Sequence, residues 1–89
     1  MKTIHNTQQT SLLAFHSLKD LNGRQAQVYG VIRNHGPISN LQVAEILKMP
    51  INSIVPRVFE IRAKGLVQES HRGESPLTGR TVIFWETVE

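Results

Sequence analysis

The sequence predicts a mostly helical α+β domain, with three helices followed by a two- or three-stranded β sheet and a short extra helix at the N-terminus. Three segments between residues 22 and 64 repeat apolar residues at helical spacing and carry capping signals at their ends. After Gly65 the pattern changes to two strands separated by a polar turn. The 89 residues are enough for one domain and too few for two.

The N-terminal part of the chain is expected to differ from the rest. Residues 1–9 are polar and poor in apolar side chains, which predicts a flexible tail. Residues 10–20 hold apolar residues at helical spacing and predict a short helical segment. We expect residues 10–89 to form a single domain that starts with this segment.

The first strong helix is expected to begin at Asn22. Asn22 and Gln25 have capping-box spacing, in which each side chain satisfies a free amide of the first turn. Gly36 is expected to provide a left-handed stop, and Pro37 prevents continuation. The apolar stripe of this helix consists of Leu21, Val28 and Ile32, with Val31 beside it.

The second helix is expected to start at Ser39, with Gln42 completing another capping box. Its expected buried side consists of Leu41, Ala44 and Leu47, flanked by Val43 and Ile46. The third helix is expected over about 51–64, with Gly65 as its stop and Pro56 near its first turn, where a missing amide is tolerated. Its apolar face consists of Ile54, Val58 and Ile61.

Two strands are expected at residues 66–70 and 80–85, where β-branched and aromatic residues are enriched. Residues 72–79 between them are rich in turn formers and predict a β-hairpin with a long polar tip. A short strand around residues 36–38 can pair with this hairpin as a third strand. A tight helix–turn–helix followed by a hairpin is the winged-helix arrangement, and the hairpin is its wing.

Composition and motifs argue against several other classes of protein. The chain has no cysteine, no apolar run long enough to span a bilayer and no apolar signal stretch near its start. Its four histidines lack ligand spacing, no serine lies in a nucleophile elbow, and no glycine-rich loop resembles a phosphate cradle. We therefore expect a cytoplasmic protein with no enzymatic activity, cofactor, metal, small-molecule ligand or membrane partner.

Several stretches carry a resemblance to known proteins. They are Arg24-Gln25 with Val28, Gly36-Pro37-Ile38-Ser39, residues 50–58 and 60–67, and Leu77-Thr78-Gly79-Arg80 with Phe84-Trp85. On these residues the chain, from Thr10 to Val88, resembles a family of small winged-helix proteins encoded by phages and prophages. Its three helices and wing also resemble, more broadly, MarR-like winged-helix repressors. The resemblance implies DNA binding through the third helix and the wing.

In a helix–turn–helix, the third helix of this chain would lie in the major groove with its first residues facing base edges. The residues that then face outward are Asn52, Ser53, Pro56 and Glu60, with Arg57 on a flank. Asparagine can pair with adenine, serine with several base edges, and arginine with guanine or phosphate. The alternative makes Asn52 and Ser53 plain helix caps and Arg57 a partner of Glu60.

Contacts to the DNA backbone are expected from the wing and from the second helix. Arg72 and Arg80 lie at the two ends of the wing, although a solvated hairpin tip balanced by Glu74 is the alternative. Further candidates for phosphate contact are Ser39, Asn40 and Lys48 around the second helix. Capping alone explains Ser39 equally well.

The charge of the chain favours a polyanionic partner only mildly. The formal net charge is +3, but residues 50–89 carry five cationic and five acidic side chains. We expect a monomer to bind DNA weakly and a symmetric homodimer to bind more strongly. The candidate dimer face consists of Leu12, Leu13, Phe15 and Leu18, whose alternative role is to cover the protein's own core.

Two functions follow from these features. The first is sequence-specific binding of double-stranded DNA through residues 51–64 and 66–86, as a transcriptional regulator or accessory factor of a phage or mobile element. The second is a protein-interaction winged helix without DNA binding. The second is favoured by the apolar character of Val55, Pro56 and Phe59.

Overall fold

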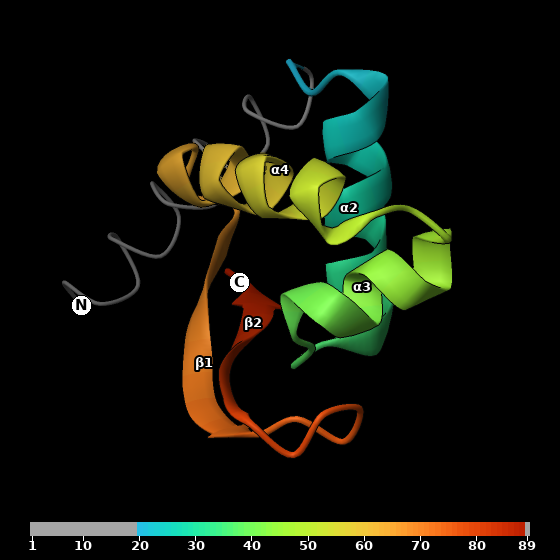
Figure 1. The fold of residues 1–89 in the computed structure, drawn as a ribbon. Coiled ribbons are helices and arrows are strands. Elements are labelled where there is room, and N and C mark those ends of the chain that lie inside the picture. Colours follow the sequence, from blue (N-terminus) through green and yellow to red (C-terminus); the bar gives the residue numbers. More distant parts are fainter. Residues whose placement is uncertain (1–19, 89) are drawn as a thin grey trace, which may run out of the picture.

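The computed structural model describes residues 20–88, in which three helices pack together above a long β-hairpin (Figure 1). The elements are α2 (Gly23–His35), α3 (Asn40–Leu47), α4 (Ile51–Ala63), β1 (Val67–Glu74) and β2 (Thr81–Thr87). This order confirms the mostly helical α+β fold that the sequence predicts. The expected tail at 1–9 and nearly all of the segment at 10–20 lie outside the described residues.

Both predicted capping boxes are present. At the start of α2, Asn22 Oδ1 accepts a hydrogen bond from the Gln25 amide at 2.8 Å, and the Asn22 amide donates to Gln25 Oε1 at 3.1 Å. At the start of α3, the Ser39 amide donates to Gln42 Oε1 at 3.0 Å, while Ser39 Oγ accepts from the Gln42 amide at 3.4 Å. Local sequence therefore defines where these two helices begin.

The ends of the helices depend on different backbone geometries. Gly65 has a φ of +80° and lies just after α4, which confirms the predicted left-handed stop. Gly36 does not have that conformation: its φ is −67° and its ψ is 156°, so the prediction of a left-handed stop was wrong there. A Cβ at Gly36 would lie 2.6 Å from the Ile32 carbonyl oxygen and 3.0 Å from that of Trp85. Glycine is needed at this position because two backbone segments approach each other closely.

One apolar core joins the helices to the hairpin. Its α4 residues are Ile54, Val58 and Ile61, at most 2% exposed, as the sequence predicts. The buried side of α3 was predicted less well: Val43 and Ala44 are buried, whereas Leu41 and Leu47 are only half-buried. Because α3 packs against α2, α4 and β2 together, its buried arc centres on Val43. The other buried apolar residues of this core are Val28, Val31, Ile32, Ile38, Leu66, Val67 and Trp85.

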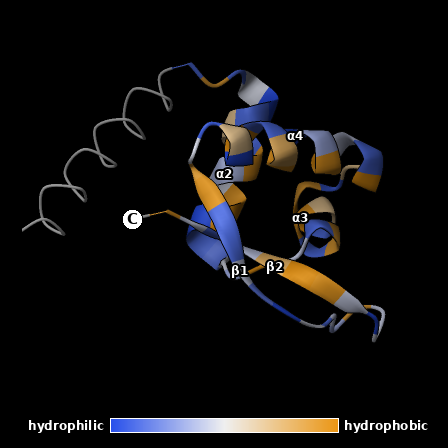
Figure 2. Cartoon of the chain, turned by 90° about the vertical axis from the view of Figure 1, so that its left-hand side faces the viewer, coloured by the Kyte–Doolittle hydropathy of each residue, from blue (hydrophilic) through white to orange (hydrophobic). Residues whose placement is uncertain are grey.

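The hairpin is longer than the sequence suggests. β1 pairs antiparallel with β2 as far as Glu74 and Thr81, with an irregularity between Glu69 and His71. Residues 75–80 form its tip, where the Ser75 amide donates to the Arg80 carbonyl at 2.8 Å. In Figure 2 much of β2 is hydrophobic, whereas the middle of β1 is hydrophilic. We call β1, β2 and this tip the wing.

The expected third strand is reduced to a single bridge. The Ile38 amide donates to the Trp85 carbonyl at 3.0 Å, and the Trp85 amide donates to the Ile38 carbonyl at 2.8 Å. This pair of hydrogen bonds ties the turn between α2 and α3 to the wing. Within residues 20–88, no helix is long and apolar enough to cross a membrane.

Gly36→Ala should destabilise the fold, because the added methyl meets two carbonyl oxygens of the backbone that cannot move independently. We expect the free energy of unfolding, measured by urea titration, to fall by about 1–3 kcal/mol. The matched control is Gly30→Ala within α2, where a Cβ meets nothing within 4 Å. This control should gain about 0.5–1 kcal/mol from helix propensity. Equal stability of the Gly36→Ala variant and the wild type would contradict the close approach.

Candidate nucleic-acid interface

The start of α3, the first half of α4 and the wing surround an open hollow of about 490 Å³. Its lining residues are Ser39, Asn40, Leu41, Ile51, Val55, Arg72, Thr81, Val82 and Ile83. Most of these side chains are apolar, and Arg72 is the only charged one among them. The hollow therefore brings together residues of the three segments from which the sequence predicts DNA contacts.

The polar side chains in the first turn of α4 make no hydrogen bond with residues 20–88. Pro50 is the N-cap residue and makes no side-chain capping bond, and the Ser53 amide donates to the Pro50 carbonyl at 2.9 Å. The interpretation of Asn52 and Ser53 as helix caps is therefore wrong. Asn52 is exposed and Ser53 is half-buried.

Pro56 lies inside α4, one turn after Asn52, and is exposed. Because proline has no amide hydrogen, it cannot donate to the Asn52 carbonyl as other helical residues would. The outward surface at the start of α4 thus consists of Ile51, Asn52, Val55 and Pro56, which we call the reading face.

The reading face is more apolar than the sequence suggests. Ile51 is 38% exposed and Val55 is 46% exposed, and Phe59 continues the same side of the helix at 70% exposure. These three residues are four apart and therefore lie above one another along α4. The exposure of Ile51 could not be predicted from the sequence, because an apolar residue at a helix start is as often buried.

Arg57 is held by a chain of side-chain contacts that reaches back to α2. Arg57 Nη2 donates to Glu60 Oε2 at 2.8 Å, and Gln25 Nε2 donates to Glu60 Oε1 at 2.8 Å. Because Gln25 Oε1 also accepts from the Asn22 amide, both ends of the Gln25 side chain are engaged. The predicted pairing of Arg57 with Glu60 is thus present, and its contact with DNA stays a prediction.

The charge of Glu60 is stabilised by the same chain of contacts. The hydrogen bond from Gln25 holds the pKa of Glu60 below its ordinary value, against the effect of desolvation. The hydrogen bond and the charge of Arg57 act in the same direction, as does the charge of Lys64. Glu60 is therefore ionised at neutral pH and remains an acceptor for Arg57.

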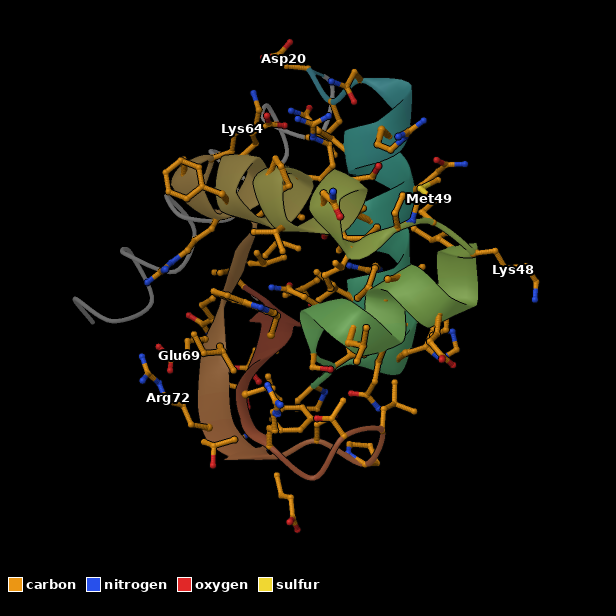
Figure 3. All side chains as sticks on the ribbon, in the orientation of Figure 1. Asp20, Lys48, Met49, Lys64, Glu69 and Arg72 are labelled. Carbon is orange, nitrogen blue, oxygen red and sulfur yellow. The ribbon has the colours of Figure 1, made fainter. Side chains whose placement is uncertain are left out.

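The two wing arginines differ in their surroundings. Arg72 Nε donates to Glu69 Oε2 at 2.8 Å, with the Arg72 side chain 67% exposed, so Glu69 rather than Glu74 is its partner. Figure 3 shows Glu69 and Arg72 beside β1. Arg80 is exposed at the wing tip, and its guanidinium makes no hydrogen bond or ion pair with the part of the chain that the structure describes.

The candidates around α3 are arranged differently from one another. Ser39 is 1% exposed, and its Oγ accepts from the Gln42 amide at 3.4 Å, as the capping alternative expects, and also donates to Gln42 Oε1 at 3.1 Å. Asn40 borders the hollow, and its Oδ1 is buried without a hydrogen-bond donor among residues 20–88. Lys48 follows α3 with a φ of 56°, is exposed, and lies on the opposite side of the molecule from Arg72 (Figure 3).

Two further features of the described residues bear on function. The Arg62 guanidinium carbon lies 5.3 Å from the centre of the Trp85 ring, which is buried in the core. No group of three or more histidine, cysteine, aspartate or glutamate side chains within residues 20–88 can hold a metal ion. The four residues of the candidate dimer face, Leu12, Leu13, Phe15 and Leu18, lie outside the described residues.

No protein-family model and no curated protein matches the sequence, but several solved structures have the same fold. FabT of Streptococcus pneumoniae, solved in complex with DNA, has a TM-score of 0.63 at 18% identity, over 80% of this chain and 47% of FabT. The multiple antibiotic resistance repressor MarR has a TM-score of 0.61 at 21% identity, over 98% of this chain and 62% of MarR. The transcriptional regulator PA4135 has a TM-score of 0.59 at 16% identity, over 98% of this chain and 60% of that regulator.

The chain thus spans between about half and three fifths of the length of these structures. The order of elements in this chain is three helices followed by an antiparallel two-stranded wing. The chain has the winged helix-turn-helix fold.

Proposed function

We propose that this protein binds double-stranded DNA in a sequence-specific manner, with α4 in the major groove and the wing along the backbone. The observation that carries this proposal is the hollow where the reading face, the start of α3 and Arg72 of the wing meet. Helix–turn–helix proteins use the first residues of the second motif helix to contact base edges. In this chain Ile51 and Asn52 are exposed at the start of α4, and Asn52 makes no side-chain hydrogen bond within residues 20–88.

The cations around the reading face suit contacts to phosphate. Arg80 has no partner among the described residues, and Arg72 has only an exposed ion pair with Glu69. Exposed pairs of this kind contribute about 0–1 kcal/mol, so Arg72 can turn to a phosphate at little loss of stability. On the side of α3, the candidates for phosphate contact are the neutral Asn40 and the cation Lys48.

The role of transcriptional regulator, or accessory factor of a phage or mobile element, rests on likeness. The sequence resemblance gives the phage setting, and two of the similar structures are described as a regulator and a repressor, while a third contains DNA. In this role the protein acts by occupying DNA in the cytoplasm and carries out no catalysis.

Binding as a symmetric homodimer is part of the proposal. Residues 20–88 carry eight cationic and six acidic side chains, so a single copy neutralises few phosphates. Two copies double the contacts and fix the spacing of two half-sites. Leu12, Leu13, Phe15 and Leu18 remain the candidate dimer face.

A second candidate function is binding of a protein partner through α4. Phe59 favours it, because a phenylalanine that is 70% exposed next to Val55 is typical of an interaction surface. This function needs no DNA and leaves the wing cations without a role.

The first test is the binding of a fluorescently labelled pool of random duplexes, measured by anisotropy at several salt concentrations. We expect the affinity to fall as salt rises, because bound phosphates release counterions. Arg80→Ala should weaken binding and reduce the slope of log affinity against log salt by about 0.9, the value for one phosphate. The matched control is Arg33→Ala on α2, which removes a charge beside a different hollow. Equal slopes for the wild type and Arg80→Ala would remove Arg80 from the interface.

The second test uses Glu60→Gln to release Arg57. The amide keeps an oxygen for Gln25 but loses the charge that holds the guanidinium. Arg57 then becomes available to phosphate, and we expect tighter duplex binding with a slope steeper by about 0.9. Glu45→Gln, an exposed position on α3, removes the same charge without releasing an arginine. Equal binding by the two variants, or an increase that persists in Arg57→Ala/Glu60→Gln, would show that Arg57 does not contact DNA.

The third test separates the two candidate functions. If α4 binds DNA with its first turns, Phe59→Ala should retain duplex affinity within about threefold, since surface substitutions are usually within ±0.5 kcal/mol. Circular dichroism checks that the variant is folded. Failure of the wild-type protein to bind any duplex at low salt would instead favour the protein-partner function.

A further inference from the structure

The reading face has a chemical composition that restricts which bases it can recognise. Ile51, Asn52, Val55 and Pro56 are all exposed, and none of them carries a charge. We infer that this face recognises A·T base pairs, with the Asn52 amide on adenine and Val55 against the C5-methyl group of thymine. The inference rests on the proposed DNA binding and names the base pairs that this binding selects.

The adenine contact follows from the free amide of Asn52. A carboxamide offers one acceptor and two donors, which match the N6 donor and N7 acceptor of adenine in the major groove. The N-cap position is occupied by Pro50, so Asn52 is not needed to close the first turn of α4. Its side chain is exposed and makes no hydrogen bond within the described part of the chain, and both ends are therefore available to a base.

The thymine contact follows from the apolar residues next to Asn52. Val55 is 46% exposed and lies three residues after Asn52, which places the two Cβ atoms about 5–6 Å apart. Base pairs are stacked about 3.4 Å apart, so the two side chains reach the same or neighbouring base pairs. Ile51, which is 38% exposed, extends the apolar surface by one more side chain.

The same residues disfavour G·C pairs. Guanine is bound best by the donors of arginine or lysine, and the cytosine amino group by a carboxylate. The first charged residues along α4 are Arg57 and Glu60, which bind each other at 2.8 Å. Arg57 Nε is buried as well. The reading face thus lacks both kinds of partner that a G·C pair requires.

The surroundings of this face suit a duplex rather than a purely apolar partner. Ile51, Val55 and Arg72 border one hollow, so a cation lies beside the apolar surface. A major groove that contains thymine has the matching arrangement, with methyl groups on its floor and phosphates along its edges.

The inference is tested with three alternating duplexes of about 20 base pairs, roughly two helical turns. They contain A·T, A·U or inosine·C pairs. Uracil lacks only the thymine methyl group. Inosine·C has the minor groove of A·T but presents the acceptors and amino group of G·C in the major groove. We expect the wild type to prefer A·T over A·U by about fourfold for each methyl contact, since a buried methyl group contributes about 0.8 kcal/mol.

Preference for A·T over inosine·C should be larger, about 5- to 100-fold for one bidentate contact. Asn52→Ala should remove most of this second preference. Val55→Ala should remove the preference for thymine over uracil and, because cytosine also lacks the C5-methyl group, lower the preference over inosine·C by the same factor, with the salt dependence unchanged. The matched control for Val55→Ala is Ile46→Ala, because Ile46 is 44% exposed on α3 and does not border the hollow. The Ile46→Ala variant should keep the preference for A·T over both A·U and inosine·C.

The outcomes distinguish this inference from the proposed function. Salt-dependent binding that is equal for all three duplexes would overturn the recognition of A·T pairs while leaving DNA binding intact. Preferences that persist unchanged in Asn52→Ala and Val55→Ala would overturn the assignment to the reading face. Absence of binding to every duplex at low salt would instead overturn the proposed function itself.

Discussion

The burial of one face of α4 is the constraint on which the candidate interface depends. Ile54, Val58 and Ile61 are almost completely buried in the core, where α4 packs against α2, α3 and β1. Each such side chain stabilises the fold by about 1.5–3 kcal/mol relative to its exposed state. If α4 were turned about its own axis by one residue, these three side chains would leave the core. Their burial therefore determines which side of the helix faces outward. The residues that remain outside, Ile51, Asn52, Val55 and Pro56, are therefore determined by the core.

Features that depend on neighbouring residues could be predicted from the sequence, and features that depend on distant ones could not. The capping boxes, the helix order and the hairpin follow from local spacing, and the structure has all of them. A Cβ at position 36 would meet the carbonyl oxygen of the nearby Ile32 at 2.6 Å, and also that of Trp85 at 3.0 Å, which is 49 positions along the chain. The bond between Gln25 and Glu60 joins residues 35 positions apart. No periodicity or capping rule contains that information.

The Gln25 side chain gives the interface a connection to the start of α2. Its oxygen accepts from the Asn22 amide, and its nitrogen donates to the carboxylate that binds Arg57. A single amide thus completes a helix cap and fixes a charged pair on the neighbouring helix. Because both of its ends are used, the position of Arg57 depends on how α2 begins.

The low charge of the interface has a consequence for specificity. Binding to non-specific DNA comes almost entirely from phosphate contacts, and the cations here are few. Two of these cations form ion pairs within the protein: Arg57 with Glu60, and Arg72 with Glu69. Weak non-specific binding reduces competition from the many wrong sites of a genome, since discrimination is the ratio of specific to non-specific affinity. In the proposed complex, a reading face of Asn52 and apolar side chains would add affinity only where the bases match, and two copies in a dimer would add that contribution twice. A neutral reading face with few flanking cations is therefore compatible with DNA recognition, provided that base contacts and dimerisation supply what the phosphates do not.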